Sequence, residues 1–164
     1  MKGYHRSIHQ GLLDIMRSHS DAVLIGEDIC DPFGGCYNMT RGFSKRFNGR
    51  VINTPISEGG IMGLANGLSL MGFHPIVEIM FYDFMTLCLD QILNHAIPLK
   101  TNILIRTVVG DKCYGYTHSK DLDYIFSNVM TVFHPMFDDS PGSVLKEAFD
   151  TDGVVLFVEE KRWY

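Results

Sequence analysis

Several common functional signatures are missing from this sequence, and each absence narrows what the protein can do. The chain has 164 residues with 14 basic and 19 acidic side chains and no basic block, so nothing predicts nucleic-acid binding. No apolar run reaches the roughly 18 residues that a membrane-spanning helix requires. The first residues lead into neither a secretory apolar segment nor an Arg- and Ser-rich transit composition. We therefore expect no export and a cytoplasmic location.

Cysteine pairs and phosphate-binding signatures are missing as well. The four cysteines form no CxxC pair and no metal-like spacing with histidine, so they are expected to be reduced intracellular thiols. The P-loop pattern GxxxxGK followed by Ser or Thr does not occur, and GGIMGLANG does not satisfy GxGxxG. There is also no GxSxG nucleophile elbow. The standard reasons to predict a P-loop, a Rossmann site or a serine hydrolase are thus lacking.

What the sequence does contain is an alternation of apolar strand-like runs and helical patterns. Hydrophobic residues make up 46% and charged residues 20%, which is typical of a globular domain, and no repeat or linker divides the chain. Short runs that are apolar on both faces predict buried strands, and apolar residues at helical spacing predict helices. The predicted strands are 22–28, 51–52, 74–80, 102–106, 129–133 and 153–158, and the predicted helices 4–19, 40–47, 58–71, 81–95, 121–126 and 140–149. This order predicts one three-layer α/β domain, a parallel sheet with helices on both faces.

The stretch 53–72, NTPISEGGIMGLANGLSLMG, combines a carboxylate at a helix start with several glycines. Glu58 lies on the first helical turn, where a carboxylate can simply respond to the helix dipole. Glycine costs about 1 kcal/mol per helical position against alanine. The glycines therefore predict close packing of another backbone, or function, along one stripe of the helix, which is formed by Gly60, Gly63 and Gly67.

Polar residues follow several of the predicted strands. Glu27 follows the first strand and Glu58 the second. The stretch from Met80 to Asp83 follows the third strand, and a loop with His118 follows the fourth. Ligands of open parallel sheets usually bind beyond the carboxyl ends of the strands. Chance would also place acids there, because strand ends are exposed. From the pattern alone, the sequence predicts an α/β domain with an acidic cleft at this edge.

The segment NTPISEGGIMGLANGLSLMGFHPIVEIMFYDFMTLCLDQILNHA resembles a known family. It is similar to the beta subunit of the thiamin-diphosphate-dependent 2-oxo acid dehydrogenases of pyruvate and branched-chain type, in their transketolase-like pyrimidine-binding domain. LIGEDI and GGCYNMTRGFSKRF precede it, and IRTVVG, THS and FVEEKRWY follow it, in the family's order. The likeness covers essentially the whole chain. It implies a single pyrimidine-binding domain over residues 1–164, without the C-terminal domain into which relatives continue.

The resemblance assigns roles to individual residues. Glu58 matches the glutamate of the family's ISE motif, which hydrogen-bonds the pyrimidine ring nitrogen of thiamin diphosphate and activates the cofactor. Ile56, Met80 and Phe84 match positions that contact the pyrimidine. Without the motif, plain core packing would be the default for Met80 and Phe84. His118 in THS matches the active-site histidine of the family's QHS motif, with changed neighbours that leave the substrate open.

The resemblance also implies a role for Glu27 and a bound potassium ion. Glu27 in GED matches an acid near the subunit interface that relatives are thought to use in proton communication between active sites. A solvated acid at a strand end is the alternative. Relatives often hold a structural potassium ion on backbone carbonyls, and the matching backbone here is that of Ile103, Ala148, Thr151 and Gly153.

The family's diphosphate site predicts a partner chain. Relatives bind the diphosphate through Mg²⁺ with a GDG motif and a downstream Asn on a separate domain, and Gly110-Asp111-Lys112 is not that motif. The resemblance therefore implies that this chain holds only the pyrimidine end of the cofactor. An alpha-type chain would supply the rest in an alpha2beta2 assembly, with a lipoyl or carrier protein as acceptor.

The activity implied by the resemblance is decarboxylation of a 2-oxo acid and acyl transfer to a lipoyl group. Transketolase-like transfer of a two-carbon ketol unit to a lipoyl or carrier-protein thiol is the alternative among enzymes. A catalytically silent assembly subunit is the alternative outside them. Glu58 and His118 favour an enzyme, because a silent subunit has no chemical reason to keep both.

Overall fold

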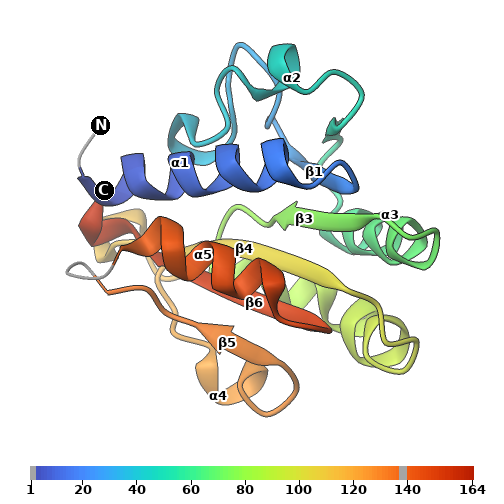
Figure 1. Ribbon diagram of the computed structural model, residues 1–164. Coiled ribbons are helices and arrows are strands. Elements are labelled where there is room, and N and C mark those ends of the chain that lie inside the picture. Colours follow the sequence, from blue (N-terminus) through green and yellow to red (C-terminus); the bar gives the residue numbers. More distant parts are fainter. Residues whose placement is uncertain (1–2, 137–139) are drawn as a thin grey trace.

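All strands of the described residues run parallel in one sheet. The computed structural model describes residues 3–136 and 140–164. The six strands are arranged in the order β2-β1-β3-β4-β6-β5 (Figure 1). They are β1 (Ala22–Glu27), β2 (Val51–Thr54), β3 (His74–Glu78), β4 (Ile103–Val109), β5 (Thr131–Phe133) and β6 (Val154–Glu160). In this part of the chain, no helix has both the length and the apolar character to cross a membrane.

Helices and helical turns connect the strands. The α-helices are α1 (Gly3–Ser18), α2 (Phe43–Arg46), α3 (Glu58–Leu70), α4 (Asp123–Phe126) and α5 (Pro141–Asp150). Tighter or wider helical turns are η1 (Cys36–Asn38), η2 (Tyr82–Cys88), η3 (Gln91–Ala96), η4 (Lys112–Tyr114) and η5 (Lys161–Trp163). The predicted alternation of strands and helices is confirmed.

The two faces of the sheet bury separate sets of apolar side chains. On β4, Leu104 belongs to the cluster beneath α1 and α5, whereas Ile103 and Ile105 belong to the cluster beneath α3 and η2. This follows from the strand geometry, in which successive side chains point to opposite faces. Helices therefore cover both faces, and the predicted three-layer architecture is confirmed.

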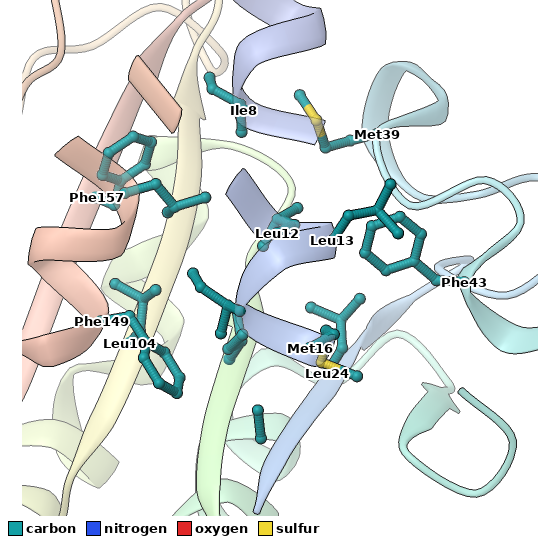
Figure 2. Close-up of a cluster of buried hydrophobic side chains, with 14 of the residues drawn as sticks. Ile8, Leu12, Leu13, Met16, Leu24, Met39, Phe43, Leu104, Phe149 and Phe157 are labelled. Carbon is teal, nitrogen blue, oxygen red and sulfur yellow. The ribbon is translucent and has the colours of Figure 1, made fainter. Parts of the chain in front are cut away.

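Helix α1 lies between the sheet, α5 and the segment that leads into α2. Figure 2 shows Leu12 at the centre of this layer, with Phe149 and Phe157 on one side and Met39 and Phe43 on the other. The two helices approach closely at Gly142, where a Cβ atom would lie only 2.2 Å from the Ser7 carbonyl oxygen. Glycine at this position is what allows α5 to lie beside α1 (Figure 1).

The helix predicted over 81–95 is confirmed, but most of its turns are not of the α type. The structure has the 3₁₀ turn η2 and, after two residues, the π turn η3. Tyr82, Met85 and Cys88 are all fully buried, and they stand three residues apart. A 3₁₀ helix has three residues per turn and aligns such a set on one face, whereas an α-helix would rotate it away from the core.

A buried arginine joins the carboxyl ends of three strands. Nη1 of Arg106 donates to Glu78 Oε2 at 2.9 Å, and Nη2 donates to Glu159, whose carboxylate also accepts the Tyr164 hydroxyl. The other oxygen of Glu78 accepts the Cys36 N–H at 2.8 Å. Burial raises the pKa of the Glu159 carboxyl, and the Arg106 guanidinium acts against this. The cluster ties β3, β4 and β6 to the loop before η1.

Replacing Arg106 by methionine is expected to destabilise the fold by about 3–5 kcal/mol, because two buried carboxylates would lose their counter-charge. Urea unfolding followed by circular dichroism near neutral pH measures the loss. Lys112→Met, which removes a charge from an exposed side chain, is the matched control. Equal stability of the two variants would contradict the structural role assigned to the arginine.

Candidate functional site

Glu27 and Glu58 come together at the carboxyl ends of two neighbouring strands. Strand β1 pairs with β2 so that Glu27 lies opposite Thr54, and Glu58 opens α3 four residues further on. The pKa of Glu27 is raised by its burial and by the negative charge of Glu58, while a backbone hydrogen bond from Ser57 opposes the shift. The charge of Glu58 thus acts on the Glu27 carboxyl group, at the edge of the sheet where the sequence placed both acids.

The first turn of α3 lies against the end of η2. A Cβ atom on Gly59 would lie 3.4 Å from the Leu87 carbonyl oxygen. Burial raises the pKa of the neighbouring Cys88 thiol to about 12, and the charges of Glu58 and Glu27 contribute. The buried, protonated thiol of Cys88 and the backbone of η2 therefore lie near Glu27 and Glu58.

His118 is held by its neighbours on three sides. Its Nδ1 atom shares a hydrogen bond with the Thr117 hydroxyl at 2.9 Å. Its ring meets the rings of Phe81 and Phe84 edge-on, with centroid distances of 4.7 and 5.2 Å. A Cβ atom on Gly110 would lie 2.0 Å from the His118 carbonyl oxygen, so the loop after β4 folds back on its own start. His118 and Phe84, both predicted as site residues, are thereby brought together.

The remaining pyrimidine-contact predictions concern Ile56 and Met80. Met80 is half-buried and lies between β3 and η2, at the same edge of the sheet as Glu27. Ile56 is 83% exposed, the largest exposed fraction among the large apolar side chains of the described residues. The pyrimidine contacts of both residues remain predictions.

The sequence placed Met80 to Asp83 at the carboxyl end of the third predicted strand, but it assigned no role to Phe81 or Asp83. Phe81 packs on His118, and the Asp83 carboxylate accepts the Lys120 N–H at 3.2 Å. The available signal was position, since the run FYDF follows closely after the end of β3 and belongs to the carboxyl edge by the rule used for Glu27.

The glycines of α3 do not share one environment. A Cβ atom on Gly63 would lie 3.4 Å from Gln91 Oε1 of the same chain, whereas Gly60 and Gly67 are exposed. The contact at Gly63 is an ordinary one with a side chain, so within the described residues no other backbone makes the close approach predicted for the stripe at this position. A Cβ atom on Gly67 would meet no atom of the described residues within 4 Å, and packing of another subunit there stays a prediction.

The backbone predicted to hold potassium lies at the opposite edge of the sheet. Ile103 and Gly153 stand at the amino ends of β4 and β6, and the Ile103 N–H donates to the Gly153 carbonyl at 3.1 Å. The Ala148 carbonyl accepts the Thr151 N–H at 3.4 Å. A potassium site there stays a prediction. Among residues 3–136 and 140–164, no cluster of three or more His, Cys, Asp or Glu side chains could hold a metal.

The side chains at the carboxyl edge fit one end of a flat heteroaromatic ligand. A carboxyl group on a helix start can share a proton with a ring nitrogen, and Phe81 and Phe84 offer aromatic surface at the same edge of the sheet. His118 keeps Nε2 for proton exchange because Thr117 occupies Nδ1. The arrangement is suited to moving protons on a bound ring.

Fold and site together define an all-parallel α/β domain with two carboxylates and an aromatic-packed histidine at the carboxyl edge of its sheet. The chain belongs to the family described as "Transketolase, pyrimidine binding domain", whose model matches residues 3–164. The resemblance inferred from the sequence motifs is thus confirmed.

Known relatives include beta subunits of larger enzymes. The chain is 34% identical over 166 residues to the 2-oxoisovalerate dehydrogenase subunit beta of Pseudomonas aeruginosa, covering 93% of this chain and 47% of that protein. It is 29% identical over 178 residues to the acetoin:2,6-dichlorophenolindophenol oxidoreductase subunit beta of Cupriavidus necator, covering 96% and 53%. The chain spans about half the length of these relatives.

A solved structure supports the fold. The split gene transketolase, described as an inactive beta4 tetramer, superposes with a TM-score of 0.77 at 23% identity, covering 95% of this chain and 50% of that one. At this identity the likeness shows the fold alone.

Replacing Glu58 by glutamine is expected to lower the pKa of Glu27, because a neighbouring negative charge that disfavours its ionised form is removed. A carbon-13 NMR titration of the Glu27 carboxyl measures this. Glu147→Gln, an exposed change on α5, should leave the titration unchanged. An unaltered pKa in the Glu58 variant would mean that the two carboxyl groups are not coupled.

Proposed function

We propose that this chain is the beta-type subunit of a split thiamin-diphosphate-dependent enzyme that decarboxylates a 2-oxo acid and transfers the acyl group to a lipoyl group. The observation that carries the proposal is the interacting pair Glu27–Glu58 at the sheet edge that also bears the ring-packed His118. The chain is 34% identical to a 2-oxoisovalerate dehydrogenase subunit beta. The acetoin relative leaves the identity of the substrate open.

Each residue has a distinct task in this proposal. Glu58 holds the proton that is shared with a pyrimidine nitrogen, and Glu27, whose pKa is already raised, exchanges protons with it. Ile56, Met80 and Phe84 exclude water from the ring. When bound, thiamin diphosphate supplies the carbon nucleophile that attacks the substrate carbonyl. His118 donates or accepts a proton at Nε2 on the substrate side.

The partner in this proposal is an alpha-type chain in an alpha2beta2 assembly. It supplies Mg²⁺ and the diphosphate site, and a lipoyl or carrier protein accepts the acyl group. Two observations support a covering partner: the relatives are themselves beta subunits, and Ile56 and Leu87 near Glu58 are 83% and 59% exposed. Proton sharing at Glu58 is stronger in a dry site, which such a cover would provide. A cytoplasmic location and a backbone potassium site belong to the same proposal.

Glu58→Gln in the reconstituted complex is expected to lower turnover by about a hundredfold or more, the usual contribution of a positioned proton-transfer group. Release of CO₂ and acylation of lipoamide from 2-oxo acids measure turnover, with ketose phosphates as the comparison substrate. Glu147→Gln should retain wild-type rates. Undiminished turnover of the Glu58 variant would favour a silent assembly subunit, and activity on ketose phosphates alone would favour ketol transfer.

Thiamin diphosphate with Mg²⁺ is expected to bind this chain weakly until the alpha-type partner is added, because Gly110-Asp111-Lys112 does not match the GDG motif that holds the diphosphate in relatives. Isothermal titration calorimetry of the chain alone and of the complex tests this. Tight binding to the isolated chain would show that the diphosphate is held here after all.

A further inference from the structure

The loop that carries His118 has little packing of its own. Residues 111–117 are all exposed, and Tyr116 is 80% exposed. Within the loop, hydrogen bonds run to Gly115, whose carbonyl accepts the His118 N–H at 3.3 Å and the Ser119 hydroxyl at 3.1 Å. Such bonds shape the loop but do not attach it to the sheet. The position of His118 therefore depends on contacts outside this stretch.

Besides the Phe81 ring, whose centroid lies 5.9 Å from that of Tyr114, one carboxylate on η2 attaches the loop. Asp83 is buried, with its side chain 7% exposed, and its Oδ2 atom accepts the Lys120 N–H at 3.2 Å. Oδ1 accepts no hydrogen bond from the described residues and lies 3.9 Å from the Lys120 ammonium. One lysine thus meets the carboxylate through both its backbone and its side chain, two residues after His118.

The same turn of η2 also supplies the rings that pack on His118. Phe81 and Phe84 flank Asp83 in the sequence and meet the imidazole edge-on. The Lys120 ammonium in turn lies 4.3 Å from the centre of the Tyr116 ring, which connects the exposed part of the loop to the buried carboxylate. The residues of η2 and Phe81 just before it therefore contact both the His118 ring and the backbone of Lys120.

We propose that Asp83 is a positioning residue that holds the His118 loop through Lys120. The Asp83–Lys120 contact fixes the backbone just after His118, while Gly110 sets the close approach at the start of the loop. Asp83 touches no reacting group and acts only through His118. The catalytic consequence rests on the proposed function, whereas the structural consequence does not.

The test uses the full chain and its Asp83→Ala variant. Exchange of the Lys120 amide is expected to rise about tenfold or more, because the amide loses its acceptor and the loop opens locally. The His118 ring signals in NMR should broaden, while the amides of β4 keep their protection. Lys120→Met, which retains the backbone bond, should show a smaller effect, and Asp111→Ala, an exposed acid in the same loop, none.

In the reconstituted complex, Asp83→Ala is expected to lower kcat about a hundredfold with little change in KM, as for a misplaced catalytic group. In a His118→Ala background, Asp83→Ala should lower kcat hardly any further, since Asp83 acts through His118. Asp83→Asn, which keeps an acceptor for the Lys120 N–H, should restore part of the rate.

Two results would overturn the proposal: unchanged Lys120 exchange in Asp83→Ala, or an undiminished rate loss when His118 is already absent. A complex without thiamin-dependent turnover would instead refute the proposed function. Amide exchange and the His118 signals, measured on the chain alone, would then still decide whether Asp83 holds the loop.

Discussion

The buried bridge from Arg106 to Glu78 and Glu159 is the interaction on which the carboxyl edge of the sheet depends. Three strands end within a few residues of these side chains, and a guanidinium without access to water must satisfy both acids at once. Glu78 is in register with Gly26, so it points to the face opposite Glu27. At this edge, the Arg106–Glu78–Glu159 cluster thus occupies one face of the sheet, and Glu27 lies on the other face.

This division explains how a small domain can present a site on segments outside its regular strands. The turn η2 leaves β3 four residues after Glu78, and the His118 loop leaves β4 four residues after Arg106. Because the bridge holds these two strand ends together, both segments start from fixed points. The aromatic contacts between Phe81, Phe84 and His118 then join the segments to each other.

The sequence predicted those features that depend on periodicity and strand order. Apolar runs located the strands, and the rule for parallel sheets brought Glu27, Glu58 and His118 to one edge. It could not reveal the change of helix type between η2 and η3, because an apolar spacing of three was read within a longer helical pattern. It did not identify Arg106 either, since a charged residue at the end of NILIR is typical of an exposed strand end, and only tertiary structure supplies its two acids.

The contact between Gly110 and the His118 carbonyl also affects how readily the length of the loop between them can change. The two ends of the stretch 111–117 touch, so its closure is already provided by the framework. Lengthening a loop closed in this way is cheap, about 0.6 kcal/mol for each doubling. Insertions among residues 111–113 would therefore cost little stability and leave in place the contacts by which Gly115 and Thr117 hold His118.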